Sequence, residues 1–396
     1  MNVAIIGAAA TRVGKIQSPP DAEVQVLEQE VLADVVIDAV ADAGIDHSVI
    51  GGMGFAMPRP YTLQKYFGTF MASYLGIAMD GYVTEVLGNG MTGAFAFEHA
   101  ADNIRSGRAE VALALGVNFE TATSAAEHMM SSMRAVGDVN FQAQFGISPI
   151  AWYAMDAMRY MHEHGVTRAD IATVAVKNRL HASMNPVAQF QKALTLDDVL
   201  AQRPIVEPLG LYEVPPRGDG AICLVLASEQ FAKASGRPYA LVRGHGFHHE
   251  GAHQITSAPS DMIRLNAARR AGAAAFESAR LSPADIDVSE LYAPCTIVEV
   301  LVTEALGLIP TGEGAYWARE GRTRFDGDIP VATSGGLTSR GHPSYVTPLY
   351  SLLESFEQVT GRAGSRQVPN AELALTTAEL GNYNAAMVHI LEGVRP

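Results

Sequence analysis

The same order of strands and helices is predicted twice along this chain, and this repeat limits the fold more than any other feature. Apolar runs predict buried strands, apolar residues at helical spacing predict helices, and glycines mark the turns between them. The first half predicts a strand at Val3–Gly7, a helix at 28–43 closed by Gly44, a strand at 49–56, a glycine turn with a helix at 86–106, and a strand at 109–116. This order is βαβαβ.

The second half repeats it. The predicted elements are a strand at 240–244, a helix from Asp261 to Ala279, a strand at 288–292, a glycine turn at 334–341, a helix ending near Gly361, and a strand at 372–377. Continuous apolar strands alternating with helices predict parallel-rich sheets covered on both faces. We therefore expect the α/β class, with two stacked lobes forming a layered α/β/α/β/α sandwich.

The chain of 396 residues is 48% hydrophobic, which is enough for two similar lobes. We place the N-terminal lobe at residues 1–230 and the C-terminal lobe at 231–396. Residues 121–202 break the repeat and are rich in methionine. Methionine fills irregular apolar space, so this insert is either a cap over an apolar ligand or an ordinary helical subdomain with its own core.

Composition excludes several classes of function. A net charge of −14, with no run of Lys or Arg, argues against a nucleic-acid surface. No apolar run approaches the length of a membrane span, and the N-terminus lacks the basic leader and cleavage site of a signal peptide. With only two cysteines there is no disulfide framework, so we expect a cytoplasmic protein.

The order of motifs resembles the thiolase superfamily over nearly the whole chain, most closely its sterol-carrier or lipid-transfer-like branch. The resemblance rests on the strand that begins at Val3 and on several later motifs. These are Asn89-Gly-Met-Thr-Gly93, Ile104–Gly107, Ala112–Val117, Asp219–Ala221, Gly312–Gly314, Ser334–Pro343, Gln367–Val368 and Val388–Leu391. Each motif alone is weak, but their order is specific.

In that family a helix-opening turn carries a nucleophilic cysteine, whose thiolate is stabilised by the helix N-terminus and forms an acyl-enzyme. The matching position here is Gly90, so the nucleophile is missing. Asn89 and Gly90 instead predict a turn whose backbone N–H groups bind an oxyanion. The simpler interpretation is that the glycines only serve a tight turn and close helix packing.

The resemblance implies a catalytic histidine at His342, in Gly341-His-Pro343. The family's second acid/base residue falls near Thr377 and Ala378 and is also missing, unless Glu379 or Tyr383 replaces it. Cys223 lies within an apolar strand and is expected to be inert. Cys295 lies near a family active-site loop and is a candidate for a reactive thiol.

Without these cysteines, the chain is similar to lipid-transfer-like members that act as retro-aldolases on β-hydroxyacyl-CoA esters from steroid side chains. Such a reaction needs a base for the β-hydroxyl and donors for the thioester carbonyl, but no acyl-enzyme. Tyr292 matches a tyrosine loop of those aldolases, and Tyr345 follows His342 closely. The alternative for both tyrosines is a packed aromatic ring with its hydroxyl satisfied. His342 stands where the aldolases have a second tyrosine.

We therefore predict an acyl-CoA C–C lyase that uses His342, Tyr292 and Tyr345. The alternatives are an acetyl-CoA acyltransferase and a non-catalytic subunit that binds acyl-CoA or lipid. Coenzyme A enters as part of the substrate, and no separate cofactor is expected. The resemblance also implies a homodimer and a small partner protein with an OB-fold and a zinc ribbon.

Four histidines cluster in the sequence at His245, His248, His249 and His253. They lack the carboxylate and the spacing of a zinc-protease motif. The sequence therefore predicts no metal site.

Overall fold

The computed structural model describes residues 1–18, 22–58, 64–77, 81–136, 138–250 and 262–395. The first half contains β1 (Val3–Ala10), α1 (Glu28–Ala43), β2 (Ile50–Ala56), α2 (Phe67–Tyr74), β3 (Val83–Val86), α3 (Thr92–Arg105), β4 (Val111–Phe119) and, after the insert, β7 (Asp219–Ser228) and α8 (Glu229–Ser235). The insert contains α4 (Ala125–Val136), α5 (Pro149–His164), α6 (Arg168–Ser183), α7 (Leu196–Leu200) and the short strands β5 (Pro204–Val206) and β6 (Leu209–Gly210). The second half contains β8 (Tyr239–His249), α10 (Asn266–Ala279), β9 (Val288–Glu290), α11 (Thr296–Ala305), α12 (Gly314–Arg319), α13 (Gly336–Ser339), α14 (Thr347–Val359), β10 (Leu373–Leu380) and β11 (Ala385–Val394).

The sheet confirms that the two halves repeat one topology. Its strand order is β3-β2-β4-β7-β1-β8-β11-β10-β9. Strands β2-β4-β7-β1 therefore correspond to β9-β10-β11-β8 in the same neighbour order and with the same pairing directions. The halves meet where β1 pairs with β8, at Ala4 with Leu241 and Ile5 with Ala240.

The sheet is mixed, which differs from the parallel-rich sheets expected above. β7 runs antiparallel to both of its neighbours, and β11 does the same in the second half. Sequence periodicity marks a strand as buried but does not give its direction. The last strand of each half enters the sheet between earlier strands, and this creates the antiparallel ladders.

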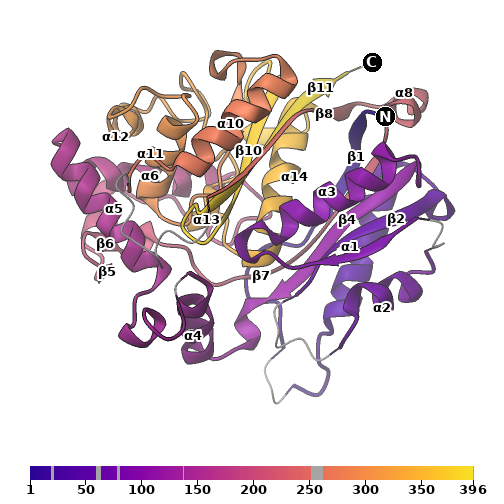
Figure 1. Cartoon of the computed structure of the whole chain (residues 1–396), viewed down its shortest axis with the longest axis horizontal. Helices are drawn as coiled ribbons and strands as arrows, with labels where there is room; N and C mark the ends of the chain where they lie inside the picture. Colours follow the sequence, from indigo (N-terminus) through magenta and orange to yellow (C-terminus); the bar gives the residue numbers. More distant parts are fainter. Residues whose placement is uncertain (19–21, 59–63, 78–80, 137, 251–261, 396) are drawn as a thin grey trace.

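Helices cover the sheet in the order expected for a five-layer sandwich (Figure 1). α1 packs on β1 and β7, α3 and α14 lie together between the two halves, and α10 packs on β8 and β11. Three apolar clusters fill the spaces between these layers. Glycines allow close approach of helix and strand: a Cβ on Gly54 would lie 1.9 Å from the Ala96 carbonyl oxygen of α3.

Several boundaries match the sequence prediction and others do not. α1 ends at Ala43, and Gly44 follows it with a φ of 67°, so the predicted glycine cap is confirmed. The helix predicted from Asp261 to Ala279 corresponds to α10, which begins at Asn266. Its predicted start, Asp261, lies outside the described residues. The motif at Val388–Leu391 lies within β11, a strand that the repeat itself does not predict. Within the described residues, none of the helices is both long enough and apolar enough to cross a bilayer.

Candidate active site

A cavity of about 330 Å³ opens at the turn between β3 and α3. Most of the surface that lines this cavity is apolar, and a few polar side chains converge on it. This combination is typical of a small-molecule site. The lining residues are Asn89, Ala125, His128, Met129, Ser132, Ser148, Pro149, Ile150, Tyr153, Ile205, Val214, Pro215, Pro216, Arg217, Tyr292, Pro294, His342, Ser344, Glu379, Gly381 and Asn382.

Asn89 and Gly90 form the first turn of the helical segment that leads into α3. Asn89 has a φ of 45°, a left-handed conformation that asparagine adopts more readily than most residues. Its carbonyl accepts a hydrogen bond of 2.6 Å from the Thr92 hydroxyl, which in turn accepts one of 2.9 Å from the Gly88 N–H. This pattern fixes the turn at the positive end of α3.

Gly90 faces the hydroxyl of Tyr292. A Cβ atom on Gly90 would lie 2.7 Å from that oxygen and 2.6 Å from the backbone carbonyl oxygen of Glu379. Both distances are too short for a carbon contact, so no side chain fits at position 90 without a shift of its neighbours. The phenol of Tyr292 therefore occupies space that a cysteine side chain needs.

Tyr292 and His342 face one another across this space. The Tyr292 hydroxyl lies 3.5 Å from His342 Nε2, and the two rings meet edge to face at 81°. The other ring nitrogen, Nδ1, lies 2.9 Å from the Thr347 hydroxyl. Two titratable groups at this distance, one held by a third residue, have the arrangement of an acid/base pair.

The backbone of Tyr292 is fixed from β10 and from the turn that follows it. Its N–H donates to the Thr377 hydroxyl at 2.8 Å, and its carbonyl accepts from the Tyr383 hydroxyl at 2.6 Å. Tyr383 thus contacts Tyr292 from behind, and it is not among the described residues that line the cavity. Its geometry is that of a positioning residue.

Glu379 brings a buried carboxyl group to the cavity wall. It accepts hydrogen bonds from the Tyr153 hydroxyl at 3.3 Å and from the Tyr383 N–H at 3.1 Å. Burial away from water outweighs these bonds and raises the pKa of Glu379 to about 7. A carboxyl with this pKa exchanges protons near neutral pH.

Two other predicted site residues, Tyr345 and Cys295, are next to lining residues in the sequence but do not themselves line the cavity. Tyr345 is 8% exposed and Cys295 is fully buried, and neither is among the described lining residues. Burial raises the pKa of the Cys295 thiol well above its usual value, and the nearby carboxylates of Glu213 and Asp156 act in the same direction. This environment is the opposite of the electropositive setting that activates a thiol.

Sequence reasoning missed Glu120, His128, Ser344 and Tyr153. Glu120 is fully buried beside the cavity; it accepts from the Ser344 hydroxyl and lies 3.0 Å from His128 Nδ1. A signal existed for Glu120, because it directly follows β4 and functional side chains gather at strand ends. Ser344 directly follows the Ser334–Pro343 motif but lies outside it, and His128 and Tyr153 stand in the insert, where the sequence shows no motif, so only the fold brings the three together.

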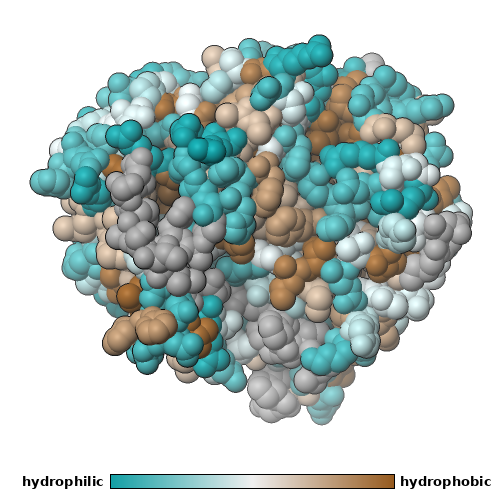
Figure 2. All heavy atoms as spheres, viewed as in Figure 1, coloured by the Kyte–Doolittle hydropathy of each residue, from teal (hydrophilic) through white to brown (hydrophobic). Residues whose placement is uncertain are grey.

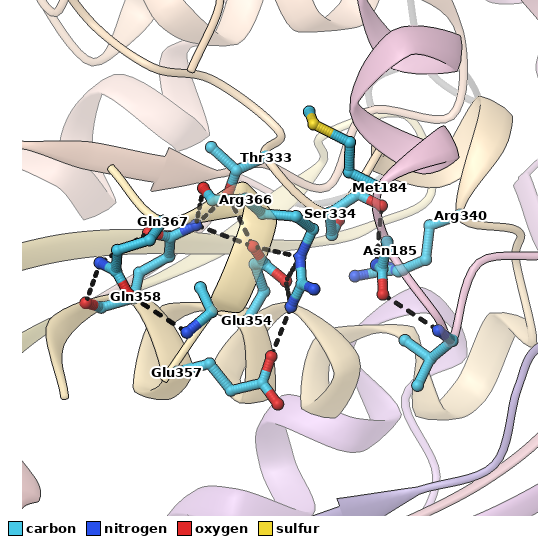
Figure 3. A network of polar contacts seen from close by, with 12 residues as sticks. Met184, Asn185, Thr333, Ser334, Arg340, Glu354, Glu357, Gln358, Arg366 and Gln367 are labelled. Atoms are coloured by element: carbon cyan, nitrogen blue, oxygen red, sulfur yellow. Dashed lines mark hydrogen bonds and ion pairs between the residues drawn. The ribbon is translucent and has the colours of Figure 1, made fainter. Parts of the chain in front are cut away.

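A buried polar network lies at the start of the loop that carries His342, and Figure 3 shows the part of it around Thr333, Glu354 and Arg366. Glu290, at the end of β9, accepts from the Ser334 N–H at 2.9 Å and the Ser334 hydroxyl at 2.8 Å. Thr333 donates to Glu354 at 2.9 Å, and Arg366 joins Glu354 to Glu357. These bonds fix the start of the glycine turn at 334–341 and thereby the position of His342.

The methionine-rich insert contains examples of both alternatives. Met129, on α4, lines the cavity, whereas Met161 packs against the largest apolar cluster. Met130 and Met158 are exposed. One side of the insert therefore forms a wall of the cavity. Met161 instead packs in the core, and Met130 and Met158 are exposed.

Comparisons with known proteins agree with this architecture. The sequence matches the thiolase N-terminal domain family over residues 3–212 and the thiolase C-terminal domain-like family over residues 249–393. It is 31% identical to an acetyl-CoA acetyltransferase of Methanothermobacter thermautotrophicus, over 98% of this chain and 99% of that protein. It is 32% identical to sterol carrier protein 2 of Oryctolagus cuniculus over 88% of this chain, which spans 65% of that longer protein.

A solved structure described as the Ltp2-ChsH2(DUF35) aldolase superposes with a TM-score of 0.82 and 26% identity, covering 99% of this chain and 97% of that one. An acetyl-CoA acetyltransferase from Syntrophomonas wolfei shares the fold, with a TM-score of 0.71, 16% identity, and coverage of 99% and 98%. The similarity to sterol carrier protein 2 and to the Ltp2-ChsH2(DUF35) aldolase is consistent with a lipid-transfer-like branch, and the chain belongs to the thiolase superfamily.

Proposed function

We propose that this protein cleaves a C–C bond of a β-hydroxyacyl-CoA ester by a retro-aldol reaction, without a covalent acyl-enzyme. The observation that carries the proposal is the placement of the Tyr292 hydroxyl, 2.7 Å from where a side chain at Gly90 would begin and 3.5 Å from His342. A proton-transfer pair occupies the site of the family's nucleophile. The aldolase described in the similar structure supports the same reaction class.

The reaction begins with the β-hydroxyl group of the substrate. With the His342 proton on Nδ1, facing the Thr347 hydroxyl, Nε2 accepts the phenolic proton of Tyr292. Tyr292 takes the proton of the β-hydroxyl as it passes its own to His342. The Cα–Cβ bond then breaks, the β-carbon becomes a carbonyl, and the electron pair moves into the enolate of the thioester.

The thioester end of the substrate requires donors and an acid. The turn at Asn89 and Gly90 lies at the positive end of α3, where backbone N–H groups stabilise a developing enolate oxygen. Glu379, with its pKa near 7, supplies the proton that the α-carbon takes up. The products are a carbonyl compound and an acyl-CoA shortened by the cleaved fragment.

The cavity wall favours an apolar acyl group. Met129, Ile150, Ile205 and Val214 lie on its sides, so most of the buried substrate contact is with hydrocarbon. A steroid or lipid side chain is the substrate class that fits this lining and the similarity to sterol carrier protein 2.

A second candidate function is acyl transfer, favoured by the 31% identity to an acetyl-CoA acetyltransferase over almost the whole chain. This reaction requires a nucleophile, and Cys295 is buried with its thiol pKa raised. A non-catalytic subunit that binds acyl-CoA is the third candidate. The Tyr292–His342 pair favours catalysis over binding alone.

We further propose a cytoplasmic homodimer that works with a small partner protein. β3 is an edge strand of half-buried residues, and apolar side chains of Leu87 and Phe247 are exposed nearby. Figure 2 shows apolar residues gathered in the middle of the face that is turned toward the viewer, over α3 and β8. The similar aldolase is named for two components, one of them marked DUF35, and this supports the additional partner.

The test is product analysis by mass spectrometry with a panel of β-hydroxyacyl-CoA esters, using the chain alone and together with any protein that co-purifies. We expect a carbonyl product and a shortened acyl-CoA in equal amounts. The His342→Gln variant should lose this activity and keep its fold by circular dichroism. Free CoA with transfer of the acyl group to an acceptor would support the acyltransferase instead.

A further inference from the structure

Two histidines lie side by side on the face of the sheet that is directed toward α3. His245 of β8 and His389 of β11 are direct cross-strand partners, and their rings are 5.4 Å apart. Gly244 and Gly246 flank His245 and contact α10 on the opposite face. Because side chains alternate along a strand, His245 and His389 are directed away from α10.

Glu98 of α3 meets these two histidines. Its Oε1 lies 2.8 Å from His389 Nε2, and its Oε2 lies 3.9 Å from His245 Nε2. The three ligand atoms all lie within 4.8 Å of one another. Two imidazoles and one carboxylate from three separate elements therefore converge on one point.

The surroundings hold these groups in place. The Arg105 guanidinium donates to Glu98 Oε2 at 2.7 Å, and the Phe97 ring meets the His389 ring edge to face at 5.1 Å. Orientation of a ligating carboxylate by a second residue is a feature of protein metal sites. His389 is 2% exposed, while Nε2 of His245 is buried and has no hydrogen-bond partner among the described residues.

We propose that Glu98, His245 and His389 bind a zinc ion, with water completing the coordination. Zinc takes imidazole nitrogen and carboxylate oxygen at about 2.0–2.2 Å, which in a tetrahedron separates the ligand atoms by about 3.3 Å. The separations of 2.8 Å from Glu98 Oε1 to His389 Nε2 and 3.9 Å from Glu98 Oε2 to His245 Nε2 lie on either side of this value, and all three ligand atoms lie within 4.8 Å of one another, so side-chain shifts are needed to complete the site. The carboxylate comes from a distant helix, which explains why the histidine spacing alone predicted no metal.

The site links parts of the fold that carry the cavity. Glu98 lies roughly 9 Å along α3 from Thr92, where the Gly90 turn enters the helix. β8 and β11 belong to the other half of the sheet. A bound zinc ion would therefore tie the helix of the glycine turn to the second half of the molecule.

The test uses the 396-residue chain after treatment with a chelator and dialysis. Zinc uptake is measured by equilibrium dialysis with elemental analysis, and cobalt is used as a spectroscopic probe of the same site. We expect one equivalent per chain and a visible cobalt spectrum. Loss of an outer-sphere partner weakens metal binding by about 10–100-fold, so His245→Gln and Glu98→Gln should each weaken it by at least about 100-fold.

His248→Gln is the matched control, because His248 lies on the same strand and is partly exposed but pairs with Glu250 at 3.6 Å. Its zinc affinity should equal that of the wild type. Three results would overturn the proposal: no saturable zinc binding, a zinc affinity of His245→Gln equal to that of the wild type, or a loss of affinity in His248→Gln equal to that in His245→Gln.

Discussion

The hydroxyl oxygen of Tyr292 lies 2.7 Å from the point that a Cβ atom on Gly90 would occupy. These two positions are therefore coupled: a side chain at 90 and the observed position of Tyr292 exclude each other. In the thiolase superfamily this turn supports a nucleophile, and here it faces a phenol. A thiol side chain at position 90 and the Tyr292 hydroxyl would need the same space, so the glycine at 90 permits the observed position of Tyr292.

Enlarging Gly90 should destabilise the fold. Gly90→Ala places a methyl group against Tyr292 and the Glu379 backbone, and overpacking of this kind costs about 1–3 kcal/mol. Gly14→Ala is the control, since a Cβ there meets nothing within 4 Å. Urea unfolding measures both free energies. Gly90→Cys should be at least as unstable as Gly90→Ala and should form no acyl-enzyme; full stability with acylation would contradict this packing.

The two candidate tyrosines should behave differently. Tyr292→Phe removes the hydroxyl that faces His342, so turnover should fall by about 10²–10⁴-fold, the usual contribution of a general acid or base. Tyr345→Phe alters a residue outside the described cavity lining and should lower turnover by less than about threefold. Steady-state kinetics measures both effects, and equal losses would remove the distinction.

Glu379 should control the alkaline side of the activity profile. Its pKa is raised to about 7, so the protonated acid is lost as the pH rises through 7 and turnover should decline. Glu379→Gln cannot supply this proton; its turnover should be low and should lack this decline. Because the folded form holds the proton more tightly than the unfolded form, wild-type stability should also fall between about pH 4.5 and 7.

Asp156→Asn is the matched control for Glu379. Burial raises the pKa of Asp156 to about 8, yet Asp156 is not among the described lining residues. Because the folded protein holds the Asp156 proton more tightly than the unfolded chain, Asp156 should make the wild type less stable as the pH rises from about 4 to 8. Asp156→Asn should remove this loss of stability and leave the pH profile of turnover unchanged. Thermal unfolding across this pH range gives the first result and initial rates the second. A changed activity profile would assign the alkaline decline to Asp156.

The ion pair of Lys177 and Glu299 should be essential to the packing of α6 against α11. Lys177 Nζ lies 2.5 Å from Glu299 and 2.7 Å from the Val331 carbonyl, with both side chains buried. Lys177→Met leaves a buried carboxylate without its cation, which costs about 3–5 kcal/mol. Lys177→Met with Glu299→Leu should recover part of this loss in urea unfolding. No recovery would mean that the hydrogen bond from Lys177 to the Val331 carbonyl stabilises the fold more than the ion pair does.

Sequence patterns predicted the repeated elements well because burial and period are local properties. The helix at 28–43 and its Gly44 cap agree with the structure to the residue. Strand direction could not be predicted, since the antiparallel placement of β7 and β11 depends on contacts far apart in the sequence. The pattern does not separate β11 as a strand of its own, because its continuous apolar run follows closely on β10.

The candidate site was predicted in part. Asn89, Tyr292, His342 and Glu379 line one cavity, and their catalytic roles stay predictions. Tyr345 is only three residues from His342, but it stands in the short helical turn Ser344–Val346, which begins after His342, and it is not among the described residues that line the cavity. Glu98 and His389 carried no shared signal at all, because a helix and a strand 291 residues apart supply them.

Intact-protein mass spectrometry of a reaction quenched during turnover distinguishes cleavage without a covalent intermediate from acyl transfer through the protein. The protein is mixed with a β-hydroxyacyl-CoA ester that it cleaves, and its mass is followed together with the products. We predict a shortened acyl-CoA, a carbonyl product and an unmodified protein mass at every time point. An acyl group attached to the protein in amounts that match the catalytic turnover, on Cys295 or any other residue, would overturn the retro-aldol proposal.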